Sequence, residues 1–265
     1  MELTVVGSSG SVSGPDSPAS CYLVRAPFEG RTFALVLDLG PGALGALYRY
    51  LDPREVSAIA LSHLHADHCL DVCAFYVAAR YSPTAPWPQI PVLGPAGTRE
   101  RLVAAYEVPG RDGARSEPGP GIGGQFDHHD WAPTQHVGPF RVDTVRVEHP
   151  VETYALRVTE DVDDGGSLVF SGDTGPCDPL VELATGADVL LAEAAFADAP
   201  DNPPGLHLSG RDAALAATRA GVAALVLTHI PPWHDRDTVL AEALPHFDGP
   251  VALATPGATW TIGPR

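Results

Sequence analysis

The chain has 265 residues, 45% of them hydrophobic, which is enough for one large α/β domain with a sizeable core. Its formal net charge is −17, and its 16 basic residues, all arginine, are scattered, so the composition disfavours a long nucleic acid as partner. The chain shows no signal-peptide core, no apolar run of about 18 residues and no CxxC among its four cysteines, so we expect a cytoplasmic protein with reduced thiols and no membrane span.

Apolar runs in the first part of the chain predict strands that lead into one helix. The runs at 3–6, 21–24 and 32–37 predict an opening meander, followed by a strand at 57–61. Apolar residues then recur at helical spacing from Leu70 to Val77, which predicts a helix over 70–79. A short strand at 90–93 and a helix at 97–106 follow.

A segment rich in glycine and proline separates these elements from the rest. Nine of the eighteen residues at 107–124 are Gly or Pro, which predicts a long flexible loop. A loop of this length is either a functional lid or has no fixed structure.

The second part of the chain again alternates strands with helices. Ser209 and Asp212 predict a capping box that opens a helix reaching about Arg219, with Gly221 as its C-cap. The other expected elements are strands at 140–147, 154–158, 168–170, 189–192, 224–227 and 251–254, and a helix at 237–244. Because we find no linker and no repeat, we expect residues 1–265 to form one domain.

Four metal-capable side chains fall within His63-Leu64-His65-Ala66-Asp67-His68. On an extended backbone His63 and His65 point to the same side. Asp67 and His68 follow on the turn and can aim at a second point. This pattern suits two neighbouring divalent ions, which can activate water at neutral pH and hold a phosphoryl or acyl oxygen.

Later strands deliver further polar residues at the point where each strand ends. His149, Asp173, Glu193 and His229 each follow an apolar run, and ligands gather outside the carboxyl ends of strands in open α/β folds. The whole set completes two metal shells: His63, His65 and His149 in site 1, and Asp67, His68 and His229 in site 2, with Asp173 bridging both. Imidazole and carboxylate ligands without thiolate favour Zn²⁺, with Mn²⁺ or Fe²⁺ as alternatives.

The order H-x-H-x-D-H, then His, Asp and His, resembles the metallo-β-lactamase superfamily over nearly the whole chain. The resemblance implies a four-layer αβ/βα sandwich, an α/β fold in which two mixed sheets lie between helices and the metals lie at one edge. Within the superfamily, the chain is most similar to ribonuclease Z-like phosphodiesterases. This similarity rests on Asp38-Leu39-Gly40, on Glu148-His149-Pro150, and on Glu193 followed by His207. The Glu…His pair separates this branch from true β-lactamases and from glyoxalase II-like thioesterases.

The resemblance also implies roles in catalysis. His207, held and kept basic by Glu193, would contact the phosphate or protonate the leaving oxygen. Asp67 would ligate one metal and accept a proton from the nucleophile. Asp38 would accept a hydrogen bond from a ligand histidine, with a plain turn residue as the other interpretation.

Departures from the ribonuclease Z pattern bear on the substrate. His149 and Asp173 are only 24 positions apart, which leaves no room for the long tRNA-gripping arm of many ribonucleases Z. Cys69-Leu70-Asp71 and Pro231-Pro232-Trp233 look more like actinobacterial relatives described as cyclic-nucleotide phosphodiesterases. We therefore expect a small phosphodiester substrate, and the resemblance also implies a homodimer.

Three alternatives remain open at this point. The same metals could serve a lactonase, thioesterase or arylsulfatase. The chain could be a tRNA 3′-processing endonuclease despite its charge. It could also be a non-catalytic metal-binding homologue, although the ligand set is complete.

Overall fold

The computed structural model describes residues 1–108 and 121–263, which form two seven-stranded mixed sheets. The first sheet has the order β14-β1-β2-β3-β4-β5-β6, with β1 (Glu2–Gly7), β2 (Cys21–Phe28), β3 (Arg31–Leu37), β4 (Ala58–Ala60), β5 (Pro91–Gly94), β6 (Asp127–Asp130) and β14 (Thr259–Thr261). The second has the order β13-β12-β11-β10-β9-β8-β7, with β7 (Thr134–Val137), β8 (Phe140–Arg146), β9 (Tyr154–Glu160), β10 (Ser167–Phe170), β11 (Val189–Glu193), β12 (Leu225–Thr228) and β13 (Val251–Leu253). In each sheet antiparallel strands join a parallel set, β3 to β6 in the first and β10 to β13 in the second.

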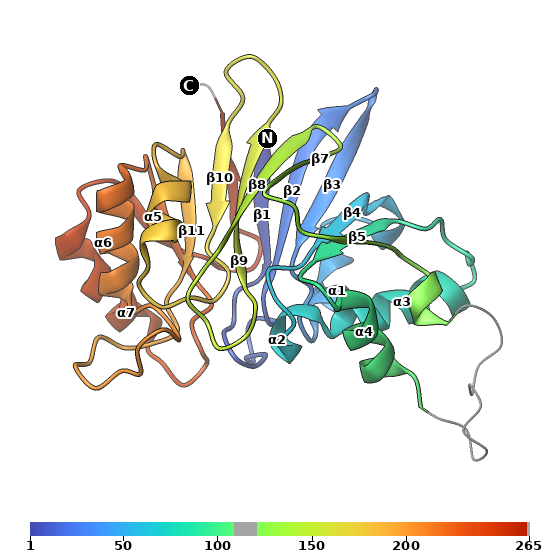
Figure 1. Ribbon diagram of the computed structural model, residues 1–265, viewed down its shortest axis with the longest axis horizontal. Helices are drawn as coiled ribbons and strands as arrows, with labels where there is room; N and C mark the ends of the chain where they lie inside the picture. Colours follow the sequence, from blue (N-terminus) through green and yellow to red (C-terminus); the bar gives the residue numbers. More distant parts are fainter. Residues whose placement is uncertain (109–120, 264–265) are drawn as a thin grey trace.

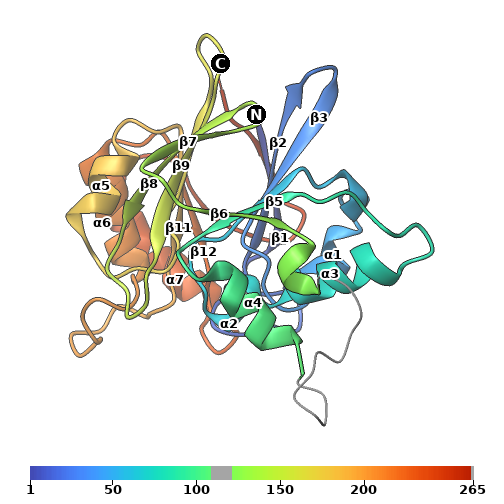
Figure 2. The same ribbon diagram turned by 45° about the vertical axis from the view of Figure 1, so that its right-hand side comes forward.

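Helices cover the outer face of each sheet, so the layers run helix, sheet, sheet, helix (Figure 1). On one side lie α1 (Ala43–Leu47), α2 (Ala66–Cys69), α3 (Asp71–Tyr81) and α4 (Thr98–Tyr106). On the other side lie α5 (Asp178–Ala184), α6 (Gly210–Ala220) and α7 (Arg236–Ala243). Short 3₁₀ helices occur at Pro53–Glu55, Ile122–Gly124 and Leu244–His246. This confirms the predicted four-layer sandwich (Figure 2).

The hydrophobic core has three layers because each sheet is buried on both faces. In β2, Tyr22 and Val24 pack between the sheets, whereas Cys21 and Leu23 pack against the helices. Side chains alternate across a strand, so a strand buried on both faces needs a continuous apolar run. The third layer lies between the second sheet and α5 to α7.

Each predicted strand and helix is present in the structure, with ends shifted by a few residues. The capping box is confirmed: Ser209 and Asp212 bond reciprocally, and Gly221 caps α6 in the left-handed region. Of the predicted loop at 107–124, residues 109–120 lie outside the described part of the chain. Its last residues, Ile122–Gly124, form a 3₁₀ helix rather than irregular loop.

No helix within the described ranges is long and apolar enough to cross a membrane. The single-domain assignment for residues 1–265 stays a prediction.

Candidate metal centre

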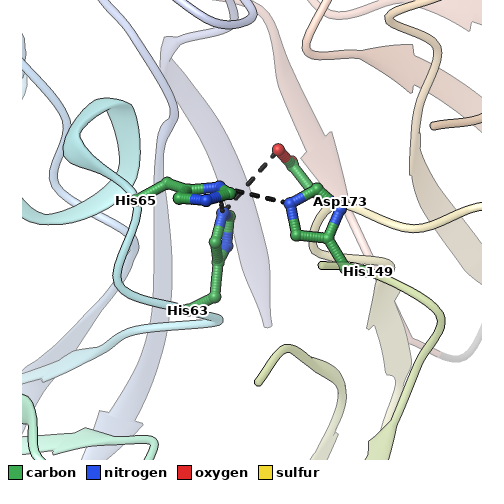
Figure 3. A group of neighbouring side chains, drawn as sticks. All are labelled: His63, His65, His149 and Asp173. Atoms are coloured by element: carbon green, nitrogen blue, oxygen red, sulfur yellow. Dashed lines mark hydrogen bonds and ion pairs between the residues drawn. The ribbon is translucent and has the colours of Figure 1, made fainter. Parts of the chain in front are cut away.

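Three histidine rings and one carboxylate meet at the first candidate site (Figure 3). His65 Nδ1 lies 3.1 Å from His63 Nε2 and 3.2 Å from His149 Nε2. Asp173 Oδ2 lies 3.8 Å from His63 Nε2. His63 and His65 come from the segment after β4, and His149 comes from the segment after β8.

Hydrogen bonds on the far side of two rings direct nitrogen lone pairs into this candidate site. His149 Nδ1 donates to the Leu206 carbonyl over 2.9 Å, so its Nε2 carries a lone pair in the neutral ring. The Ser62 hydroxyl donates to Asp38 and therefore accepts from His63 Nδ1, over 3.0 Å. Two lone pairs thus face the same point. A tetrahedral zinc with bonds of about 2.0–2.1 Å would hold ligand nitrogens roughly 3.3 Å apart, close to the spacing found.

The second candidate site comprises Asp67, His68, Asp173 and His229. His68 Nε2 lies 3.2 Å from Asp173 Oδ1 and 3.4 Å from Asp67 Oδ2, and His229 Nε2 lies 3.3 Å from Asp173 Oδ2. His68 Nε2 and Asp173 Oδ1 are buried and have no hydrogen bond of acceptable geometry. Buried polar atoms are nearly always satisfied, and a divalent cation between these groups would satisfy both.

Buried partners fix the orientation of the second set of ligands. Asp38 accepts three hydrogen bonds: from His68 Nδ1 over 2.7 Å, and from the Ser62 backbone and hydroxyl over 2.7 and 2.8 Å. Ser20 Oγ lies 2.9 Å from His229 Nδ1. Asp38 and His229 both have φ of 55°, a region that non-glycine residues rarely adopt. Such backbone strain persists where the surrounding structure holds it in place, often at functional sites.

Burial sets the charge of several of these imidazoles. It lowers the pKa of His63, His65 and His149, and it lowers the pKa of His229 to about 4. These rings are therefore neutral at pH 7, which is the form that binds metals.

Glu193 and His207 form a hydrogen-bonded pair beside the two candidate metal sites. Glu193 Oε1 accepts from His207 Nδ1 over 2.8 Å, while backbone amides of Thr174 and Ala195 also donate to its carboxylate. Burial raises the pKa of Glu193 to about 7. Burial would lower the pKa of His207, but the bond to Glu193 outweighs it and raises that pKa. The pair therefore retains a proton near neutral pH.

The His207 ring lies next to one residue of each site, with centroids 5.5 Å from His149 and 5.9 Å from His229. Asp173, Glu193 and His207 also lie close enough to form a third metal-sized group. The Glu193 oxygens, however, already accept from two backbone amides and from His207. We therefore interpret this group as a proton-holding pair next to a ligand.

The structure brings together every site residue that the sequence singled out. The assignments as ligands, catalytic groups and supporting acceptor stay predictions. Sequence reasoning missed Ser20, Ser62 and the Leu206 carbonyl, which hold ligand rings from behind. No sequence signal marks a backbone carbonyl or a loop serine for such a role.

A cavity of about 830 Å³ lies away from the candidate metal centre. It opens where β3, β4 and β5 begin, near Arg31, Ser57 and Pro91. None of the candidate ligands lines it, so its size is no evidence for the location of the active site.

The sequence from residue 35 to residue 230 matches the Beta-lactamase superfamily domain. The chain belongs to the metallo-β-lactamase superfamily. Protein ML1173 of Mycobacterium leprae is 49% identical over 271 residues, covering 99% of this chain and 89% of the relative. Ribonuclease Z of Mycobacterium bovis is 31% identical over 258 residues, covering 88% and 86%. The crystal structure of the metallo-β-lactamase fold protein YhfI from Bacillus subtilis superposes with a TM-score of 0.82 at 25% identity, covering 98% and 99%.

These findings confirm the predicted resemblance to the superfamily and to ribonuclease Z. Membership in this superfamily supports a hydrolase, and the His/Asp cluster suggests divalent metals.

Proposed function

We propose that the protein is a phosphodiesterase that hydrolyses a small phosphodiester, such as a cyclic nucleotide, with two divalent ions. We expect Zn²⁺ as the metal, because the proposed ligands are imidazoles and carboxylates. The observation that carries the proposal is the Glu193–His207 pair, which holds a proton next to the metal cluster.

The ligand sets are His63, His65, His149 and Asp173 for one ion, and Asp67, His68, Asp173 and His229 for the other. When bound, the ions would activate water and neutralise charge on the non-bridging oxygens. In the neutral His68 ring, the hydrogen bond from Nδ1 to Asp38 leaves the Nε2 lone pair for a metal ion.

The chain's own residues supply the proton transfers. The oxygen of water forms a bond to phosphorus as the bond from phosphorus to the leaving oxygen breaks. Asp67 accepts a proton from that water, and His207 donates its proton to the leaving oxygen. Solvent then returns the proton from Asp67 to His207, so the cycle balances.

A small substrate fits the charge and topology better than RNA. The net charge is −17, and between His149 and Asp173 lie only β9, β10 and their connections. Two cations at the centre would still attract a compact phosphate ester. We also propose a cytoplasmic location, in keeping with four free cysteines, and a homodimer.

The first test joins metal content to a substrate panel. We expect about two metal ions per chain by elemental analysis, with hydrolysis of bis(p-nitrophenyl) phosphate and cyclic nucleotides but not of a lactone. His207→Ala should keep both ions, and its turnover of a cyclic nucleotide should fall about 10²–10⁴-fold. Unchanged turnover, or preference for the lactone, would contradict the proposal.

The 31% identity to ribonuclease Z makes tRNA processing the second candidate. Phosphate-driven affinity is greatest at low salt, so binding of tRNA is measured there. We expect no binding; specific cleavage at a tRNA 3′ end would favour this alternative.

A further inference from the structure

A cleft of about 550 Å³ opens next to His207. Its walls are the segment 198–205 and the first turn of α6, with Pro176 at one side. This volume lies within the range of about 300–1,000 Å³ that is typical of small-molecule sites. None of the candidate metal ligands lines the cleft, but His207 does, so the cleft adjoins the centre described above.

His207 forms the boundary between the cleft and the candidate metal centre. Its ring packs near His149 and His229 on one side, and the same residue lines the cleft. Its Nδ1 is committed to Glu193. A group attached to an oxygen that receives a proton from His207 would therefore lie next to the cleft opening.

Four prolines and one alanine make up the apolar part of the cleft. Pro176, Pro200, Pro203 and Pro204 line it together with Ala199. Proline has a fixed backbone φ angle and loses little side-chain conformational entropy when it is buried. These walls suit an aromatic or heterocyclic ring.

The polar part offers a donor beside an acceptor. Arg211 Nη1 lies 3.7 Å from Asp198 Oδ2, and their side chains are 49% and 40% exposed. Asp212 also lines the cleft, although its carboxylate is engaged in the α6 capping box. Two carboxylates against one guanidinium disfavour an additional anion and favour an uncharged group with both hydrogen-bond donors and acceptors.

We propose that this cleft binds the uncharged, nucleoside-like part of the substrate that carries the leaving oxygen. This inference rests on the proposed phosphodiesterase function and deepens it by naming the substrate class. The cleft adds binding and orientation only, and no chemical step beyond the proton transfer from His207.

The test compares two arginines of one helix. Arg211→Ala and Asp198→Ala remove the polar part of the cleft. Arg219→Ala is the matched control, because Arg219 lies on α6, pairs with Asp178 and does not line this cleft. Binding of adenosine, which carries no phosphate, is measured on the metal-loaded protein by calorimetry.

We expect adenosine to bind the native protein and the Arg219→Ala control equally. Each cleft variant should bind about tenfold more weakly. For a cyclic nucleotide KM should rise by a similar factor with kcat nearly unchanged. Failure of adenosine to bind, or equal binding by Arg211→Ala and the native protein, overturns the proposal for the cleft.

The two proposals fail in different ways. If no phosphodiester is hydrolysed while adenosine binding still depends on Arg211, the catalytic proposal is wrong and the cleft assignment is supported. If phosphodiesters are hydrolysed and the cleft variants behave as the native protein, only the cleft assignment is wrong.

Discussion

The hydrogen bond between Glu193 and His207 connects a fully buried carboxylate to a ring at the edge of the candidate metal centre. The carboxylate stabilises the protonated form of the ring, which opposes the lowering effect of burial and raises the pKa of His207. A proton donor of this kind works only below its pKa. Activity should therefore fall as pH rises through that raised value.

Glu193→Gln should move this alkaline limb to lower pH. The amide cannot stabilise the imidazolium as the carboxylate does, so the pKa of His207 falls. A charge-assisted hydrogen bond of about 1.5–3 kcal/mol corresponds to a shift of about one to two pH units. The measurement is the pH dependence of kcat. Glu152→Gln, which changes a carboxylate bonded to the Tyr154 hydroxyl, is the control. If the alkaline limb of the pH profile does not move, His207 is not the proton donor.

Asp38 offers a second test at the residue scale, because its carboxylate accepts a hydrogen bond from one candidate ligand, His68, and two from Ser62. Asp38→Asn retains a residue type that tolerates the φ of 55° but removes the charge. We expect metal affinity to fall about 10–100-fold, as for other partners of ligand histidines. Competition with a chromophoric chelator measures it.

Asp71→Asn is the matched control for Asp38→Asn. Asp71 caps the Leu44 amide over 2.9 Å in the same region of the fold. An equal loss of metal affinity in both variants would indicate a general structural effect.

At the scale of elements, the sequence predicts the buried strands well and the edges poorly. Runs such as Leu35–Leu37 and Leu190–Ala192 are apolar because both faces of a central strand are covered. The edge strand β6 reads Asp127-His128-His129-Asp130, with no apolar residue, and was not predicted. Its pairing with β5 is a tertiary contact. The short helices α1, α2 and α5 were missed because five, four and seven residues carry too little periodicity to detect.

The ligand set was accessible from sequence because the ligands occur in a compact motif and at strand ends. The supporting contacts were not, because they depend on how segments far apart in sequence meet. Leu206, for instance, presents its carbonyl to His149 across 57 positions. The cleft beside His207 likewise exists only once the segment 198–205 lies against α6.

Alanine substitutions at two glycines test how closely the backbone segments around the candidate metal centre pack. A Cβ at Gly40 would lie 1.9 Å from the Asp67 carbonyl, whereas one at Gly45 in α1 would meet nothing within 4 Å. Gly40→Ala should displace the start of α2, weaken metal binding and cost about 2 kcal/mol or more of unfolding free energy. Gly45→Ala should stabilise by about 0.5–1 kcal/mol. Denaturant unfolding measures both, and equal effects would contradict the packing described.

At the scale of the whole molecule, the candidate ligands come from both sheets. His63, His65, Asp67 and His68 follow β4 of the first sheet, while His149, Asp173 and His229 belong to the second. Ions bound among them would tie the two halves together. Binding to the native state alone stabilises it by about 2.7 kcal/mol per ion at a free concentration of about 100 Kd.

Removal of metal should therefore lower the thermal midpoint of the whole chain. A chelator is expected to lower Tm by several degrees, and re-addition of Zn²⁺ should restore it. Asp173→Ala, which removes the carboxylate common to both groups, should show a much smaller response to the chelator. A chelator effect as large in this variant as in the native protein would show that metals bind elsewhere.

The double membership of Asp173 also has a consequence for how the centre fills. Its Oδ1 faces His68 of the second site, whereas its Oδ2 faces both His63 of the first site and His229 of the second. An ion that binds this carboxylate fixes the rotation of the Asp173 side chain. That rotation then raises or lowers the affinity of the other site for the second ion. Loading is then interdependent, and a metal titration should depart from two identical, independent binding steps. A protein supplied with two kinds of metal could settle into a mixed pair whose composition depends on which arrives first.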